Sequence, residues 1–154
     1  MSVWTHVAGS VRIDAFMEYF QTLKEVEDIL GKPTSYEDTI QEWDRCKLPM
    51  GSEGSIQYRI IQSGMQETNK EGNITSSDAA AFVVNFWGDL RDFETKDVKK
   101  IETWWSDLLL NHDLMIRQAV LLVETEGGNP RVFIHKDHPS YDPKQAKIIE
   151  MLLP

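Results

Sequence analysis

The sequence predicts an α+β protein with a ferredoxin-like split βαβ sandwich, in which an antiparallel sheet carries two main helices on one face. The first observation behind this class is the order of the elements, because strand-like and helix-like segments follow one another as β-α-β-β-α-β. An extra strand and helix are expected after them. The second observation is size. With 154 residues, 41% of them hydrophobic, the chain can build one core, so residues 1–154 are expected to form a single domain.

The N-terminal third predicts a strand, a long helix and a short helix. Residues 3–13 alternate in polarity with a period of two, which indicates a half-buried strand. Asp14 then occupies the position of a helix N-cap, and apolar residues recur at near-helical spacing up to Leu30, ahead of the stop signal Gly-Lys-Pro. A short helix is expected within residues 34–54, which end in the turn sequence GSEG.

The rest of the chain predicts four further strands and two helices. Residues 55–61 are rich in β-branched and aromatic side chains, and residues 80–90 are apolar at nearly every position. The second of these strands is expected beside the first strand of the chain, at the centre of the sheet. A long mobile loop is expected at 62–79, and a hairpin is expected from the strands 116–126 and 131–135. Between them a helix is expected, with the inward residues Val98, Ile101, Trp105, Leu108, Leu109 and His112. A final helix is expected to begin at Asp142 and Pro143, with the inward residues Ala146, Ile149, Leu152 and Leu153.

Outward side chains of the sheet are the expected functional residues, because the helices of such a fold cover only the other face. On the first strand, Val7, Val11 and Ile13 are expected to face inward. The outward set can hold a planar anionic ligand, since indoles stack, a guanidinium grips a phosphate or carboxylate, and an amide reads an edge. The candidate ligand-binding residues are Trp4, His6, Arg12, Arg59, Asn85 and Trp87, with Ser10, Gln57 and Gln118 beside them.

A second interpretation of this face stays open. The extra strand, the 62–79 loop, the final helix or a second subunit would cover it, and Trp4 and Trp87 would then be core or interface residues. Sheets of RNA-recognition domains stack bases on similar aromatic residues, but the glycine-aromatic signature of that module is missing. The sequence therefore leaves a single nucleotide and a covering element as alternative occupants.

Charge and cysteine content exclude several classes of partner. The chain has 16 Lys and Arg against 25 Asp and Glu, and a net charge of −9 repels a long nucleic acid. Cys46 is the only cysteine, there is no apolar leader, and no apolar run reaches about 18 residues, so we expect a cytoplasmic protein without a membrane partner. No metal and no cofactor are expected, because His135 and His138 lack further ligands at a fixed spacing and no phosphate-binding glycine motif occurs.

Two stretches of the chain resemble known proteins. The opening MSVWTHVAGSVRID and the later GSEGSIQY resemble small uncharacterised proteins of phages and prophages. The resemblance implies an accessory protein that acts on a host system by binding, either blocking a host protein or sequestering a small signalling molecule. It assigns no functional residue.

Three functions are compatible with these observations. The first is a non-enzymatic binding protein, expected to be a homo-oligomer, that uses its open sheet face or acidic surface for a small anionic or nucleotide ligand or for a host protein. The second is a small enzyme with His6 as general acid or base and Arg12 or Arg59 as anion clamp, since histidine titrates near neutral pH. The third is a structural or assembly component. The lack of a catalytic arrangement favours a protein without enzymatic activity.

Overall fold

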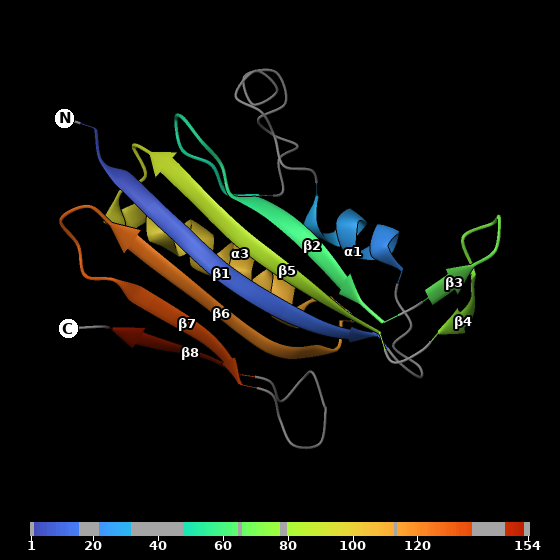
Figure 1. Cartoon of the computed structure of the whole chain (residues 1–154). Coiled ribbons are helices and arrows are strands. Elements are labelled where there is room, and N and C mark those ends of the chain that lie inside the picture. The colour runs from blue at the N-terminus through green and yellow to red at the C-terminus, as the bar shows by residue number, and fades with distance from the viewer. Residues whose placement is uncertain are drawn as a thin grey trace.

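The computed structural model describes residues 2–15, 22–31, 48–64, 66–77, 80–112, 114–136 and 147–152. Within these ranges the protein is α+β, as the sequence predicts, with an antiparallel sheet and the two helices α1 and α3 (Figure 1). The elements are β1 (Trp4–Ala15), α1 (Leu23–Leu30), β2 (Gln57–Ser63), β3 (Gln66–Thr68), β4 (Ile74–Ser77), β5 (Ala80–Arg91), the 3₁₀ turn η3 (Thr95–Asp97), α3 (Val98–Leu110), β6 (Ile116–Thr125), β7 (Arg131–Lys136) and β8 (Lys147–Leu152).

Six strands form the main sheet in the order β2-β5-β1-β6-β7-β8, and each neighbouring pair is antiparallel. The strands β1 and β5 pair along their whole length, from Trp4 opposite Arg91 to Ala15 opposite Ala80. This confirms that the first strand and the apolar 80–90 strand lie side by side. The hairpin of β6 and β7 is also confirmed, and β8 extends the sheet beyond it.

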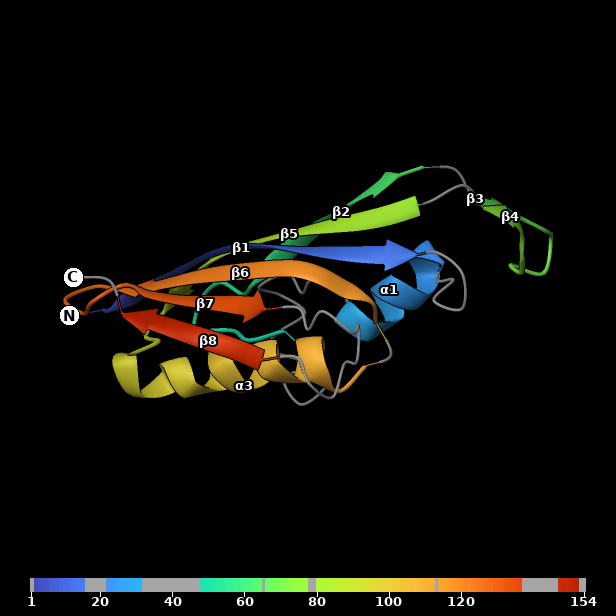
Figure 2. The ribbon, with the colours of Figure 1, turned by 90° about the horizontal axis from the view of Figure 1, so that it is seen from below.

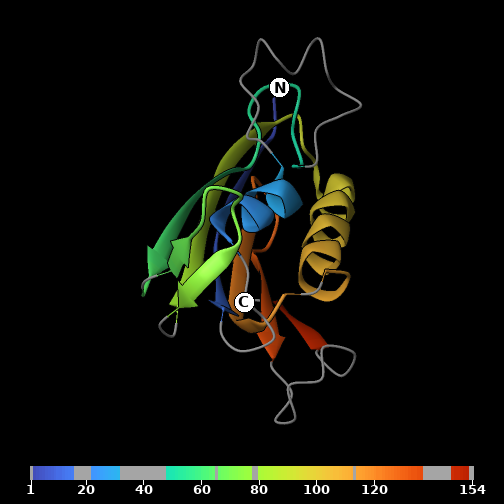
Figure 3. The same cartoon turned by 90° about the vertical axis from the view of Figure 1, so that its right-hand side faces the viewer.

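Both helices pack on one face of the sheet, as Figures 2 and 3 show from two directions. Alternation along β1 sets its two faces: Val7, Val11 and Ile13 are buried, whereas His6 and Arg12 are exposed. Successive strand residues point to opposite faces, so this burial pattern makes one face of β1 part of the core. Among the described residues, no helix or strand covers the other face (Figure 2).

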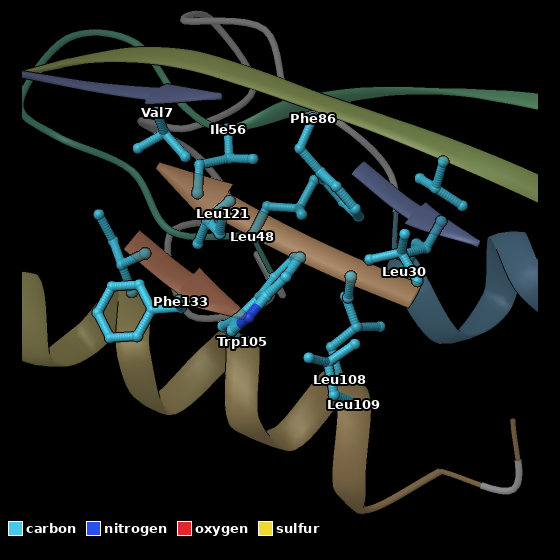
Figure 4. Packing of buried hydrophobic residues seen from close by; sticks show 14 of the residues in the cluster. Val7, Leu30, Leu48, Ile56, Phe86, Trp105, Leu108, Leu109, Leu121 and Phe133 are labelled. Carbon is cyan, nitrogen blue, oxygen red and sulfur yellow. The ribbon is translucent and has the colours of Figure 1, made fainter. Parts of the chain in front are cut away.

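The core lies between the inner face of the sheet and α3 (Figure 4). Phe86 of β5 meets Trp104 and Trp105 of α3 edge to face, with ring centroids 5.4 and 6.0 Å apart. Such contacts stabilise a core beyond the burial of apolar area. The inward positions expected for this helix are confirmed as buried: Val98, Ile101, Trp105, Leu108 and Leu109. His112 follows the helix and stays partly exposed, contrary to the expected inward position.

Asp14 is not a helix N-cap. The strand β1 continues through Asp14 to Ala15, and the described helix α1 (Leu23–Leu30) has Thr22 as its N-cap, whose side chain accepts a hydrogen bond from the backbone of the first turn. The buried carboxylate of Asp14 instead accepts hydrogen bonds from the Nε atoms of Arg12 (3.0 Å) and Arg117 (2.7 Å). The N-cap assignment of Asp14 was therefore wrong, because two guanidinium groups satisfy this carboxylate within the sheet.

The segment 62–79 is not a long irregular loop. The strands β3 and β4 pair within it as a separate two-stranded hairpin, which projects beyond the end of the main sheet (Figure 1). Its turn is held by the Asn69 side chain, whose oxygen accepts hydrogen bonds from the backbone N–H groups of Glu71 and Asn73. The polar composition that suggested a loop is the composition of this turn and its short flanking strands.

The C-terminal segment is a strand, and the expected final helix was wrong for residues 147–152. The strand β8 pairs antiparallel with β7, from Arg131 opposite Leu152 to Lys136 opposite Lys147. A free edge on β7 would leave its backbone N–H and C=O groups without sheet partners, and this pairing outweighs the helical spacing of the apolar residues. The described part of the chain thus contains eight strands, three more than expected.

Several expectations lie outside the described residues. These are the start of the first helix at 16–20, residues 34–47 of the short helix expected within 34–54, Cys46, and the segment 137–146 with His138, Asp142 and Pro143. The described residues 48–54 contain no helix.

Candidate functional site

The open face of the sheet, which we define as the outward side of β2, β5, β1, β6 and β7, carries the candidate residues. Large apolar side chains are exposed on it: Ile61 (49%), Trp87 (48%), Val120 (43%) and Leu122 (36%). Of the described large hydrophobic residues that are exposed, only Leu23 and Leu110 lie elsewhere, both on helices. Exposed apolar groups gathered on one surface are typical of a binding site.

The half of this face formed by β2, β5 and β1 holds aromatic and polar groups, and we name it the Trp87 half. Register places Arg59 opposite Asn85, and Asn85 opposite Ser10. In the next outward row, Gln57 lies opposite Trp87, and Trp87 opposite Ala8. Side chains at facing positions lie about 5 Å apart at Cβ, so these groups form one contiguous surface.

The two candidate arginines, Arg12 and Arg59, differ in their partners. Arg12 is engaged, because its Nε donates to Asp14 Oδ1 at 3.0 Å, although half of its side chain stays exposed. Arg59 is exposed, and it forms no hydrogen bond or ion pair with any residue that the structure describes. Its guanidinium is therefore available to an anion beside the indole of Trp87.

His6 and Trp4 lie at the end of the face that is farther from Arg12, among acidic groups. The Nδ1 atom of His6 lies 2.6 Å from Asp89 Oδ1, and Glu124 is opposite His6 on β6. The Trp4 backbone N–H donates to Glu126 Oε2 at 3.1 Å. This end of the face is thus acidic around one histidine.

Arg91 does not offset these acidic groups. It ends β5 opposite Trp4, and its Nη1 donates to Glu53 Oε2 at 2.6 Å. This hydrogen bond, together with the charge of Glu53, raises the pKa of Arg91 above its ordinary value. The positive charge of Arg91 is therefore already matched within the chain.

The six candidate residues share one face but do not form one site. His6 and Arg12 are six residues apart on β1, which is about 20 Å along an extended strand. Arg59 lies at the level of Ser10 and two strands away from β1, so it is also far from His6. His6 therefore lies four rows along the strands from Arg59 and six from Arg12.

Two features of the face were not found from the sequence. The carboxylates of Asp89 and Glu124 flank His6, and an aliphatic surface covers β6 and β7. The alternation of Gln118, Val120, Leu122 and Glu124 could have indicated the aliphatic surface, but residues 119–123 are apolar on both faces. A strand of that kind looks fully buried.

A cavity of about 330 Å³ lies on the helical side of the molecule. It is lined by Ile29 of α1 and by Trp104, Asp107, Leu108 and His112 of α3 and its C-terminal end. The Nε2 atom of His112 lies 3.5 Å from Asp107 Oδ2, within one turn of chain. This local pairing agrees with a structural role for His112 at the helix end.

The comparisons with known proteins add no relative. No family model matches the chain, and no curated protein and no solved structure matches it either. Within the described ranges, no helix has both the length and the apolar character needed to cross a membrane.

Proposed function

We propose that this protein is a non-enzymatic binding protein that holds a planar anionic ligand, such as a single nucleotide, on the Trp87 half of its open face. The observation that carries this proposal is the juxtaposition of Arg59, which has no ion-pair partner among the described residues, with the half-exposed indole of Trp87. A free cation beside an exposed aromatic ring is a favourable place for a ring that bears a phosphate.

The roles of the groups follow from their register. The ligand ring stacks on Trp87, and the Arg59 guanidinium donates two parallel hydrogen bonds to its phosphate or carboxylate. Asn85 and Ser10 lie opposite each other in the same row as Arg59 and one outward row from Trp87, where they can bond to a polar edge of the ligand. Arg12 contributes long-range attraction, because its side chain remains half exposed beside Asp14.

Charge limits the size of the ligand. The net charge of −9 repels a long polyanion, whereas one small anion feels mainly the local field of Arg59 and Arg12. Sequestration of a small signalling molecule is also one of the two accessory roles that the resemblance to phage and prophage proteins implies.

We also infer that the fold is a ferredoxin-like split βαβ unit enlarged at one edge. The order β2-β5-β1-β6, antiparallel throughout, supports this inference, as do the helices that follow β1 and β5 on one face. The strands β7 and β8 would be the enlargement, and the β3–β4 hairpin an insertion between two strands of the unit.

Titration with a nucleoside monophosphate, a nucleoside diphosphate, a cyclic nucleotide and inorganic phosphate tests the ligand proposal. We expect at least one nucleotide to quench tryptophan emission and to release heat on binding, and Arg59→Ala to weaken it at least about tenfold. Trp87→Phe should keep binding and lose most of the quenching. The matched control Lys99→Ala removes an exposed positive charge on α3, and it should bind as the unmodified protein does.

Two results would contradict the proposal. Absence of any heat or quenching up to about 1 mM ligand would contradict it, because a stacked ring with a bidentate phosphate should bind with a dissociation constant below about 1 mM. Equal affinity of Arg59→Ala and the unmodified protein would also do so. Binding of inorganic phosphate with the same affinity as the nucleotides would reject the stacking role of Trp87.

A further inference from the structure

We propose that two copies of this chain associate face to face through the aliphatic half of the open face, with their strands running in opposite directions. The aliphatic half consists of Val120 and Leu122 on β6 and Val132 and Ile134 on β7. Register places Val120 opposite Ile134 and Leu122 opposite Val132, so the four side chains form one apolar square. This inference goes beyond ligand binding and uses the other half of the face.

The aliphatic half has nothing over it in the described chain. Val120 and Leu122 keep 43% and 36% of their surface exposed, although they lie at the middle of a six-stranded sheet. Both helices pack on the inner face, and the β3–β4 hairpin projects beyond the end of the strands (Figures 1 and 2). An apolar surface at the centre of a sheet is stabilised when another surface removes it from water.

Charges at the two ends of the face select a reversed second copy as the occupant. At one end, His6 is surrounded by acidic groups, namely Asp89, Glu124 and Glu126. At the other end, the guanidinium groups of Arg12 and Arg117 both donate to the carboxylate of Asp14. A face that is acidic at one end and basic at the other is complementary to itself when the second copy is reversed.

A two-fold axis fixes how the copies meet. It lies between the two faces and crosses the strands at the level of Leu121, so β6 packs over β6 of the second copy. Val120 then faces Leu122 of the partner subunit, and Gln118 faces Glu124 of the partner subunit. An axis parallel to the strands would instead bring Glu124 against Glu124 of the partner subunit. Repulsion between these two negative charges disfavours that arrangement.

The area of the contact is enough for a weak specific dimer. The strands β1, β6, β7 and β8 have 12, 10, 6 and 6 residues. At about 3.3 Å per residue and about 4.8 Å between strands, they cover about 540 Å² in projection. Specific interfaces bury about 600–1,000 Å² on each partner, so this contact is just below the lower end of that range. We therefore expect a dissociation constant in the micromolar range.

The two proposals can be tested separately, because they use different strands. The strand β2 is three strand positions from β6, about 14 Å at the usual spacing. Because the axis keeps each strand over its own copy, β2 of one subunit lies over β2 of the other in the dimer, so the ligand titrations use protein below the dimer dissociation constant, where the Trp87 half is uncovered. Failure of one proposal is thus separable from failure of the other.

Sedimentation equilibrium over protein concentrations from about 1 μM to about 1 mM tests the dimer. The unmodified chain should change from monomer to dimer within this range. Leu122→Lys should raise the dissociation constant at least tenfold, because each copy buries a charge in the contact. The matched control is Leu110→Lys, which changes an equally exposed leucine on α3 (38% against 36%) and should leave the constant within twofold.

The orientation is tested by charge at Gln118, an exposed residue of β6. In the proposed dimer Gln118→Lys meets Glu124 of the partner subunit, so it should tighten the dimer severalfold, and Gln118→Glu should loosen it severalfold. The difference should shrink in concentrated salt. Thermal unfolding of each variant shows that it is folded before its mass is interpreted.

Three results would overturn the proposal. A monomer at every concentration would show that the chain does not dimerise. Equal effects of Leu122→Lys and Leu110→Lys, with a dimer present, would place the contact elsewhere. A dimer that Gln118→Lys loosens, or one that ignores both charges at this position, would reject the reversed orientation.

Discussion

Two neighbouring leucines of β6 provide the sharpest test that one face of the sheet is open. Leu121 points to the core and is 0% exposed, whereas Leu122 points to the open face and is 36% exposed. Truncation of each to alanine changes the same atoms at adjacent positions of one strand. The strand propensity is therefore matched, and the difference in stability reports only what lies over each face.

The expected losses in the free energy of unfolding follow from how much of each leucine side chain is buried. Leucine to alanine removes three carbons, about 2.4 kcal/mol of transfer free energy at about 0.8 kcal/mol each. Leu121→Ala loses all of it and leaves a cavity among core side chains (Figure 4), so we expect a loss of about 3–4 kcal/mol. Leu122→Ala loses about two thirds of it and leaves no cavity, because water fills the space, which gives about 1.5 kcal/mol.

Urea unfolding followed by tryptophan fluorescence measures both losses, at a protein concentration below the dimer dissociation constant. The unmodified chain is the reference, and equal slopes against urea confirm that both variants unfold by the same transition. If Leu122→Ala cost as much as Leu121→Ala under these conditions, a segment of the same chain would cover the outer face. Both the ligand site and the dimer contact would then have to be abandoned.

Three other substitutions test contacts within the sheet and at the start of α3. A β-carbon at Gly9 would lie 2.6 Å from a backbone oxygen of β6, so Gly9→Ala should cost about 2–3 kcal/mol in urea unfolding, and a loss below about 0.5 kcal/mol would contradict this close approach. Asp14→Ala leaves the guanidinium of Arg117, 28% exposed, without its carboxylate, and should cost about 2–3 kcal/mol, less than a fully buried pair. A hydrogen bond from Lys100 lowers the pKa of Asp97, so its stabilisation is complete above the unfolded pKa and is lost as the pH falls through the folded one. Asp97→Asn should therefore cost less than about 1 kcal/mol at pH 7 and nothing at about pH 2, and a difference that persists in acid would refute the assignment.

Local alternation explains why the faces of the strands could be predicted. Along β1 the inward and outward positions differ in polarity, and one buried face fixes them, because a shift of one residue would turn Val7 and Val11 to water. The same argument placed Asn85 and Trp87 of β5 outward. These predictions needed no knowledge of the other strands.

Pairing between distant segments explains what could not be predicted. His6 meets Asp89, 83 residues later, and Asp14 meets Arg117, 103 residues later. No periodicity within a segment reports such partners, because they depend on the register of β1 against β5 and β6. For this reason the six candidate residues looked like one site, although register separates His6 from Arg59.

The C-terminal strand illustrates a conflict between local pattern and sheet pairing. Apolar residues at 146, 149, 152 and 153 fit a helix, yet 147–152 also contains adjacent isoleucines, which favour a strand. The free edge of β7 decides between them, since backbone hydrogen bonds with β7 are available only to a strand. A sequence cannot show an edge before the order of the sheet is known.

The charge gradient along the open face and the net charge of the protein act against each other in the proposed dimer. Two copies that each carry −9 repel one another at long range, whereas the acidic and basic ends attract one another only at contact. Salt screens interactions beyond about 10 Å at 0.1 M much more than contacts of a few ångströms. Moderate salt should thus tighten the dimer while it reduces the difference between charge variants at Gln118. An apolar square alone would also be strengthened by salt, but it would accept a second copy in either direction. The orientation therefore depends on the charged ends, and affinity depends on Val120, Leu122 and their neighbours on β7.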